Sequence, residues 1–279
     1  MRTAAQNAEL ALLLEVAGTP KPGNVDRERE YEDLRFEHFL AGAVGAQEGL
    51  RMAGRVDGPP VGEAFEQAIA GMRDQRGGNT QFGALLLLAP LVRAAADGNL
   101  TRSGASDVAE STTVTDAAGF YRAFEHVAVS VEDPPADMDD LDVRRGSDAV
   151  PALHARDLSL YDVMDRSADR DGVAREWTGG FERSFGAAAR MEALAGPMTE
   201  RVARVFLELL ADEPDTFVAI NHDEATAERV SERARAALEG DEDPDALAEE
   251  LVDRGINPGT TADITAAGLF VALEGGLAI

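Results

Sequence analysis

The most apolar helical run of this chain is Thr80-Gln81-Phe82-Gly83-Ala84-Leu85-Leu86-Leu87-Leu88-Ala89-Pro90-Leu91-Val92, and the architecture is expected to form around it. Its apolar side chains cover most sides of a helix, and such a helix belongs at the centre of a protein. Pro90 has no amide hydrogen, so we expect it to kink or divide the helix. The glycine-containing segment 76–79 breaks the pattern just before the helix begins.

Helical spacing of apolar residues recurs on both sides of this stretch, whereas a convincing alternation of strands is not found. Thr3 and Gln6 have the spacing of a capping box ahead of the first helix. We therefore predict an all-α protein in which one globular domain of roughly ten helices spans residues 1–279. Helices are expected over 3–17, 33–54, 61–73, 80–92, 116–127, 159–168, 170–194 with an interruption near 179–180, 197–210, 215–220, 225–238, 244–252 and 261–273.

The segment 131–148 differs in composition from the rest of the chain, because it is rich in Asp and Pro. Both residue types favour turns and loops over regular helices. We predict an exposed acidic loop here, and it is the one plausible domain boundary.

The chain carries a formal net charge of −26, from 52 acidic and 26 basic residues. Phosphate groups would be repelled, so neither nucleic acid nor an anionic membrane is an expected partner. The regular apolar patterning argues against a disordered acidic protein. We interpret the excess charge as the carboxylate-rich, lysine-poor surface of a protein from an extreme halophile. A single carboxylate is therefore weak evidence of function.

The sequence also argues against several kinds of chemistry. It contains no cysteine, which excludes disulfides, thiolate catalysis and cysteine-ligated zinc, and its four histidines lack the spacing of a zinc enzyme. No apolar run reaches about 18 residues, so no transmembrane helix is expected. The run 10–16, interrupted by Glu15, is interpreted as part of a core helix and not as a signal peptide. We expect a cytoplasmic protein whose oligomeric state the sequence does not define.

Lys21 is the only lysine of the chain, and it lies in the loop Thr19-Pro20-Lys21-Pro22-Gly23, with Asp26 close behind. The two prolines fix φ and favour extended geometry at the residues before them. Gly23 allows a tight turn or a close approach of the backbone to a ligand. We infer that a stiff, helix-breaking loop holds this one ammonium group for a local reason.

Three glycine-containing breaks, 20–26, 76–83 and 257–263, each precede a helix or lie just upstream of one. A helix N-terminus offers free N–H groups and a partial positive charge, which suit a phosphate group. Gly78, Asn79 and Thr80 supply such donors in the second break, and Gly259, Thr260 and Thr261 supply them in the third, with Asp263 in the following turn. The same residues are also ordinary helix caps, and neither break has the spacing of a Walker A loop.

The segment 162–176 is dense in charge and includes Arg170 and Arg175. It is either a solvated helix face with ion pairs or part of a phosphate site. Trp177, the sole tryptophan, follows it and could stack on a base, although core packing is the more common role.

Taken together and in this order, these segments resemble the triphosphoribosyl-dephospho-CoA synthase family. The first and most specific block is Pro20-Lys21-Pro22-Gly23-Asn24-Val25-Asp26-Arg27. The remaining matches span nearly the whole chain: Asp33 with 39–43, Asn79-Thr80 with Gly83 and 85–88, and Asn257-Pro258-Gly259-Thr260-Thr261-Ala262-Asp263.

The chain also departs from the pattern of this family. Tyr31 stands where the family has a histidine, and Gln81-Phe82 replaces a His-Lys pair. Asn257 replaces a serine, and two threonines replace a glycine and a serine in the last block. The chain therefore resembles a divergent, archaeal-type branch of the family, and membership by itself does not fix the acceptor.

The resemblance implies a transferase that moves the triphosphoribosyl group of ATP to the 2′-hydroxyl of 3′-dephospho-CoA and releases adenine. Asp26, Asp33 and Asp263 become candidates for Mg²⁺ ligands or for the general base. Lys21 suits the triphosphate as a compact charge. The other residues expected to contact nucleotide or phosphate are Gly23, Arg27, Gly78, Asn79, Thr80, Arg170, Arg175, Gly259, Thr260 and Thr261.

Two alternatives stay open. The same pocket could serve another acceptor in an archaeal cofactor pathway, or water in a hydrolase, because the His-Lys pair is missing. A non-catalytic helical nucleotide sensor is the second alternative.

Overall fold

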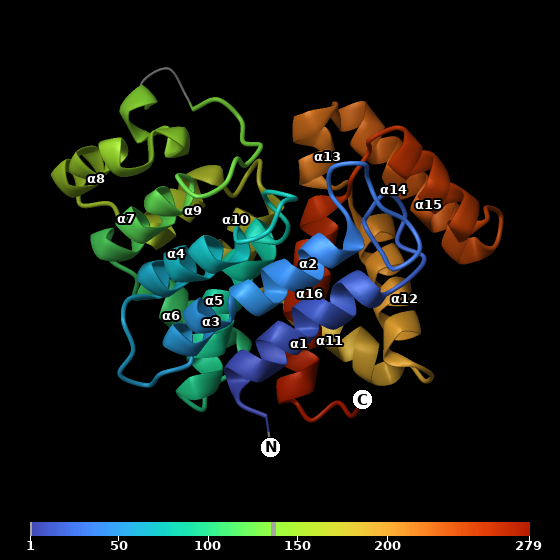
Figure 1. Cartoon of the computed structure of the whole chain (residues 1–279), viewed down its shortest axis with the longest axis horizontal. Coiled ribbons are helices and arrows are strands. Elements are labelled where there is room, and N and C mark those ends of the chain that lie inside the picture. Colours follow the sequence, from blue (N-terminus) through green and yellow to red (C-terminus); the bar gives the residue numbers. More distant parts are fainter. Residues whose placement is uncertain (1, 135–137) are drawn as a thin grey trace.

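The computed structural model describes residues 2–134 and 138–279, and over these ranges every regular element is a helix (Figure 1). The all-α prediction is confirmed, but the expected number of roughly ten helices is wrong, because sixteen α-helices and two 3₁₀ helices form. They are α1 (Ala4–Ala17), α2 (Phe36–Gly45), α3 (Gln47–Ala53), α4 (Val61–Met72), α5 (Phe82–Ala96), α6 (Arg102–Glu110), α7 (Val114–Ala123), η1 (Asp139–Leu141), η2 (Val143–Ala149), α8 (Val150–Arg156), α9 (Leu160–Ser167), α10 (Gly172–Thr178), α11 (Glu182–Ala193), α12 (Met198–Asp212), α13 (Thr216–Asn221), α14 (Glu224–Glu239), α15 (Pro244–Asp253) and α16 (Gly259–Glu274).

More helices form than expected, and the reasons are local. The expected helix 33–54 is two helices, α2 and α3, because the chain bends at Ala46. At this bend a side chain on Gly45 would collide with the backbone of Gly71 on α4, so the two helices pack unusually closely. Two further helices, α6 and α8, were not expected, because both are short and α6 is built mainly from small and polar residues.

The central stretch forms α5, and it runs through Pro90 without a break. Pro90 cannot donate to the carbonyl of Leu86, four residues earlier. The indole Nε1 of Trp177 donates to that carbonyl instead, at 3.3 Å. Trp177 is therefore buried core, and its indole satisfies the acceptor that the proline leaves open.

Both α5 and α16 are buried on most sides and pack against each other at the centre of the main core. The helices α1 and α11 also pack against α16, and α4 packs against α5. Despite this apolar centre, no helix within the described ranges is long and apolar enough to cross a membrane.

The segment 131–148 is less open than the predicted acidic loop. Residues 135–137 lie outside the described residues, but η1 and η2 form in the second half of the segment. Leu141 is buried, and its carbonyl accepts the hydroxyl of Tyr121 at 2.7 Å. This contact attaches the segment to α7.

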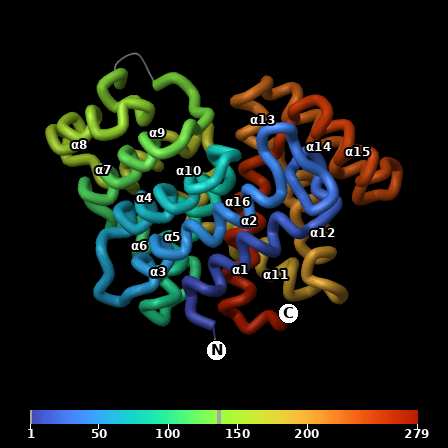
Figure 2. The backbone as a smooth tube through the Cα atoms, viewed as in Figure 1, coloured from blue at the N-terminus to red at the C-terminus, as the bar shows by residue number. Residues whose placement is uncertain are grey.

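The helices divide into two flanks when viewed as in Figure 1. One flank contains α7, α8 and α9, and the other contains α13, α14 and α15, with α10, α16 and α2 between them (Figure 1). The second flank shares a small core with α12, which includes Phe206, Val230 and Leu251. Figure 2 shows both chain ends at the side opposite these flanks, and there Asn7 near the start of α1 donates to Glu274 at the end of α16.

Candidate functional site

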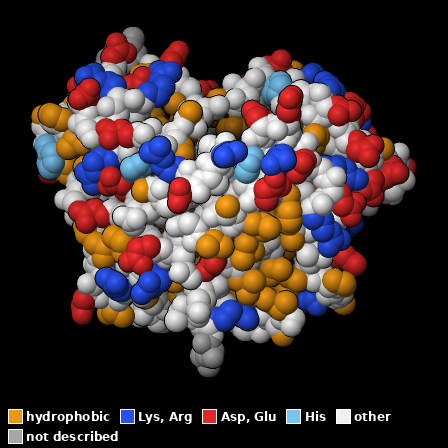
Figure 3. Space-filling model, viewed as in Figure 1, with side chains coloured by type: hydrophobic (Ala, Val, Ile, Leu, Met, Phe, Trp, Pro, Cys, Tyr) orange, Lys and Arg blue, Asp and Glu red, His pale blue; other side chains and the backbone are white. Residues whose placement is uncertain are grey.

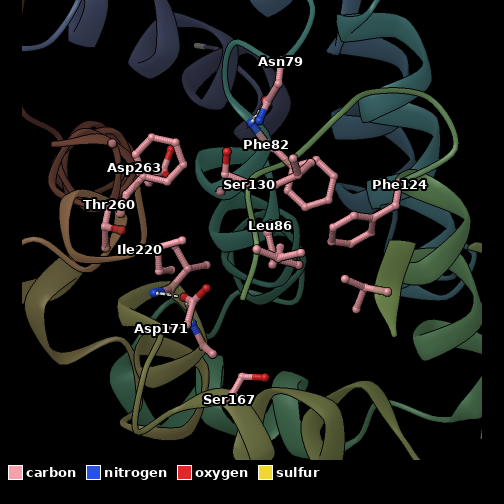
Figure 4. A pocket seen from close by; sticks show the side chains of 18 of the residues that line it. Asn79, Phe82, Leu86, Phe124, Ser130, Ser167, Asp171, Ile220, Thr260 and Asp263 are labelled. Carbon is pink, nitrogen blue, oxygen red and sulfur yellow. Dashed lines mark hydrogen bonds between the residues drawn. The ribbon is translucent and has the colours of Figure 1, made fainter. Parts of the chain in front are cut away.

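A pocket of about 580 Å³ lies where the N-terminal ends of α5, α10 and α16 meet. Both polar and apolar residues line it, and the side that carries Asp171, Thr260 and Asp263 is called here the polar side. Figure 4 shows Asp263, Thr260 and Asp171 on one side and Phe82 and Phe124 on the other. The pocket is therefore bipartite, and its two sides come from segments far apart in the sequence.

Asp263 on α16 is packed against the first turn of α5. A Cβ atom at Gly83 would collide with the Asp263 carboxylate, so only glycine permits this approach. Burial raises the pKa of Asp263 well above its usual range, while the Ala84 N–H opposes this by favouring the charged form. The charges of Glu15, Asp215 and Asp171 raise the pKa further. A carboxyl group with a raised pKa in a cleft is a candidate acid or base.

Asp171 forms the N-cap of α10, and its Oδ1 accepts the N–H groups of Val173 at 2.7 Å and Ala174 at 3.0 Å. Burial raises its pKa, although these two hydrogen bonds favour the charged form. The pocket is lined by Asp171 as well as Asp263. Two carboxyl groups with raised pKa values thus share the polar side.

The third glycine break supplies both pocket-lining and inward-facing groups. Thr260 lines the pocket, and its hydroxyl lies 3.0 Å from that of Thr216 on α13. Thr261 is buried, and Asp215 accepts both its N–H and its hydroxyl at 2.7 Å. Thr261 therefore anchors the start of α16, whereas Gly259 and Thr260 face the pocket.

The second break also reaches the pocket, through Gly78, Asn79 and Thr80. The Asn79 carbonyl oxygen caps α5 by accepting the N–H of Phe82 at 3.1 Å. The hydroxyl of Thr80 and the side-chain amide of Gln81 are buried and have no hydrogen-bond partner within the described residues. Buried polar groups without partners are rare in native proteins, and here they lie beside a pocket.

Lys21 does not line the pocket. Its side chain is fully buried, and Nζ lies 2.5 Å from Oε1 of Glu15 and 2.9 Å from Oδ1 of Asn24. It also lies 5.7 Å from the centre of the Phe206 ring. Glu15 and Asn24 do line the pocket, so the ammonium group of Lys21 contacts the pocket only through these two side chains.

The loop around Lys21 interlocks with the third break. Asn24 donates to Oδ1 of Asn257 at 2.9 Å. Gly23 has a φ of +74°, and a side chain there would collide with the carbonyl of Ile256. Tyr31, at the position where the resembled family has a histidine, donates its hydroxyl to the Gly23 carbonyl at 2.5 Å. The loop therefore positions the residues before α16.

The three carboxylates expected to bind a metal are not brought together. Asp26 is buried, and its oxygens accept the N–H groups of Lys21, Glu28 and Arg29 within the loop. Asp33 is exposed and does not line the pocket. Across residues 2–134 and 138–279, no group of three His, Asp or Glu side chains is arranged to hold a metal ion.

The expected arginines are also distributed. Arg170 lines the pocket and pairs with Glu132 at 3.0 Å. Arg27 and Arg175 are exposed and lie outside the pocket lining, Arg27 near Glu28 and Arg175 near Glu213. Six carboxylates line the pocket with only two arginines: Glu15, Glu132, Asp133, Asp142, Asp171 and Asp263 against Arg166 and Arg170.

Sequence reasoning missed part of this lining. Ser130, Ser167 and Phe124 come from segments with no glycine break or recognisable motif. Asp171 was hidden among the charges of 162–176, although Asp171-Gly172 before an apolar pair is a readable N-cap signal. Glu15 was assigned only to a core helix.

An all-helical chain whose helix N-termini and buried carboxylates meet in one large pocket has the organisation of an enzyme that handles a polar, extended substrate. The family model for ATP:dephospho-CoA triphosphoribosyl transferase matches residues 1–278, so the chain belongs to that family. A crystal structure assigned as a triphosphoribosyl-dephospho-CoA synthase from Archaeoglobus fulgidus is also similar, with 25% sequence identity and a TM-score of 0.68. The match covers 85% of this chain and 99% of that one. No curated protein matches the chain.

These comparisons confirm the resemblance read from the sequence. The family consists of transferases that use ATP and dephospho-CoA, and the assignment of this chain to an enzyme class follows from its membership.

Proposed function

We propose that the pocket binds ATP and dephospho-CoA together and transfers the triphosphoribosyl group to the 2′-hydroxyl of dephospho-CoA. The observation that carries the proposal is the placement of Asp263 against Gly83, in a pocket that all three glycine breaks line, the first of them through Asn24. Much of the rate gain would come from holding two nucleotides in one site, because positioning converts a bimolecular step into a unimolecular one.

The polar side suits the phosphates of the donor. Gly78, Asn79, Thr80, Gly259 and Thr260 line it beside the N-termini of α5 and α16, which favour anions. The hydroxyl of Thr80 is buried without a partner and lies against Gly42 of α2, so it stands behind the pocket surface. Arg170 lines the pocket and adds a guanidinium group that can bind phosphate oxygens, while Arg166 lines the pocket from α9.

Lys21, Gly23 and Asp26 act in this proposal by holding the first loop against the third break. Thr261 likewise acts through its anchor to Asp215. Arg27, Asp33 and Arg175 have no assigned contact with substrate, because they are exposed outside the pocket lining.

A metal site made from Asp26, Asp33 and Asp263 does not fit the observed placement of these residues. We treat Mg²⁺ as part of the substrate, MgATP. Six carboxylates face only two arginines in the pocket, so a triphosphate entering without a counter-cation would be strongly repelled. Mg²⁺ is commonly held by phosphate oxygens and water with few protein ligands.

The proposed chemistry breaks the bond between C1′ of the ATP ribose and N9 of adenine, and the electron pair leaves with adenine. The 2′-oxygen of dephospho-CoA bonds to C1′ through an oxocarbenium-like transition state. The hydroxyl proton passes to a carboxylate, and adenine takes up one proton on leaving. We assign the base role to Asp263, because a raised pKa brings a carboxylate closer to working pH.

We expect this activity at high salt concentration. Figure 3 shows acidic side chains gathered over α14 and α15, and the chain has a net charge of −26. High ionic strength screens the resulting self-repulsion, since the Debye length falls from about 10 Å at 0.1 M to about 3 Å at 1 M.

The test is to incubate the protein with MgATP in molar KCl, with and without dephospho-CoA, and to measure adenine and the mass of the acceptor product. Adenine release that requires dephospho-CoA is the expected result. Adenine released equally without it would identify a hydrolase, and ATP binding with no release would identify a sensor.

A further inference from the structure

The apolar side of the pocket has no role in the chemistry described so far. It is a chamber, called here the apolar chamber, bounded by α5, residues 124–134, η1 and α9. Its wall is formed by Phe82, Phe124, Met138, Leu141, Val163 and Met164. Figure 4 shows Phe82 and Phe124 facing it, with Leu86 below.

The aromatic part of the chamber is fixed by ring contacts. Phe82 meets Phe124 edge-to-face with 4.9 Å between ring centres, and Phe65 supports Phe82 from behind at 5.1 Å. Phe120 contacts Phe124 at 5.2 Å. Such pairs hold the rings in defined orientations, so the chamber surface exists before any ligand binds.

The charged residues that line the pocket from or next to these segments are Glu132, Asp133, Asp142 and Arg166, so carboxylates outnumber arginines there by three to one. The Tyr121 hydroxyl is engaged with the Leu141 carbonyl, and the Asp142 carboxylate is paired with Arg144. A phosphate buried against this wall would be repelled by three carboxylates, which a single arginine does not offset. The chamber therefore excludes the phosphates of either substrate.

The reaction geometry excludes the sugars as well. C1′ of the donor and the 2′-hydroxyl of the acceptor must both be near Asp263 on the polar side. An adenine ring in the chamber would leave several ring nitrogens and an amino group without partners, at a cost of about 1–3 kcal/mol for each buried group. The remaining part is the uncharged pantetheine arm of dephospho-CoA, with its dimethyl group, methylenes and thiol.

We propose that the apolar chamber binds the pantetheine arm and thereby selects the acceptor. This inference rests on the proposed function. Ser130 and Ser167 also line the pocket, Ser130 between Phe82 and Asp263 and Ser167 below Asp171 in Figure 4, and their hydroxyl groups can bind the amides of the arm. Phe82, which stands in place of a lysine of the family pattern, gives the chamber its apolar floor.

The experiment compares the binding of dephospho-CoA and of ADP, which is the same molecule without the pantetheine part. Calorimetric dissociation constants are measured in molar KCl for the wild type, Phe124→Ala and Val163→Thr. Phe185→Ala is the matched control, since Phe185 is a partly buried phenylalanine on α11 outside the pocket lining. Val163→Thr conserves the volume of the side chain and provides a second test of the same wall if Phe124→Ala does not fold.

Wild-type protein is expected to bind dephospho-CoA at least about tenfold more tightly than ADP, since burying a few methylenes yields that factor. Phe124→Ala and Val163→Thr should reduce this ratio by about fivefold or more, with ATP affinity changed less than about twofold. An unchanged ratio, or an equal loss of ATP affinity, would overturn the assignment. Adenine release is measured separately, so a failed transfer reaction with a reduced ratio would contradict the proposed function and leave the chamber assignment standing.

Discussion

Nζ of Lys21 lies 2.5 Å from Oε1 of Glu15, and both side chains are withdrawn from solvent. The only lysine of the chain is thus one half of a buried ion pair behind the pocket wall. Burial raises the pKa of Glu15, and the neighbouring ammonium group opposes this shift.

Lys21→Met should therefore destabilise the protein by about 3–5 kcal/mol, because it leaves a buried carboxylate without its partner. The double variant Glu15→Leu/Lys21→Met should recover most of that loss, since an apolar pair can replace a buried ion pair. Urea unfolding in molar KCl measures both. The affinity of the folded double variant for MgATP should change less than about threefold, and a loss above about tenfold would show that one of the two side chains contacts the substrate after all.

Gly83→Ala should lower activity without lowering stability. The added methyl group would displace the Asp263 carboxylate, whereas alanine is the better helix former by about 1 kcal/mol. We expect kcat/KM to fall about 100-fold, because small displacements of a catalytic group are costly. Gly186→Ala on α11 is the matched control, since a Cβ there meets no atom within 4 Å. Full activity of Gly83→Ala would refute the proposed position of Asp263.

Trp177→Phe tests how α5 tolerates its proline. The substitution removes the donor to the Leu86 carbonyl, and a buried acceptor without a partner costs about 1–3 kcal/mol. Adding Pro90→Ala restores a backbone N–H that can donate to the same carbonyl, so the double variant should be more stable than Trp177→Phe alone. If the changes in unfolding free energy of the two single variants simply add in the double variant, the coupling between the two residues is refuted. Urea unfolding measures all three variants.

Asp263→Asn should alter stability in a pH-dependent way. The raised pKa means that the folded protein retains a proton that the unfolded chain, with a pKa of about 3.9, releases. Stability is therefore lost as pH rises through the folded pKa, and the asparagine variant avoids that loss. Its melting temperature should exceed that of the wild type by more at pH 8 than at pH 5. The exposed Asp33→Asn variant is the control, and an equal difference at both pH values would contradict the buried-carboxylate account.

The helical framework was largely predictable from the sequence, because its main signals are local. The capping box of Thr3 and Gln6 and the apolar run 85–92 both appear as expected. The predicted number of helices was too low because tertiary packing determines some helix ends. The bend between α2 and α3 follows from the close approach of Gly45 and Gly71, which no local sequence pattern encodes.

The site was predictable only in part, for the same reason. The glycine breaks pointed to Asn79, Thr260 and Asp263, which do line the pocket. The burial of Lys21 depends on Glu15 in the preceding helix, and nothing in their spacing reveals that partnership. The aromatic wall is likewise assembled from α4, α5 and α7, so its rings meet only after folding.

Adenine release shows whether this pocket transfers a triphosphoribosyl group with Asp263 as the base. Wild-type protein and Asp263→Asn are mixed with MgATP and dephospho-CoA in molar KCl, and adenine and acceptor product are measured over time. We expect one adenine per product molecule, dependence on dephospho-CoA, and a rate about 10²–10⁴-fold lower for the variant. A wild-type protein that releases no adenine, or a variant that matches the wild-type rate, would contradict it.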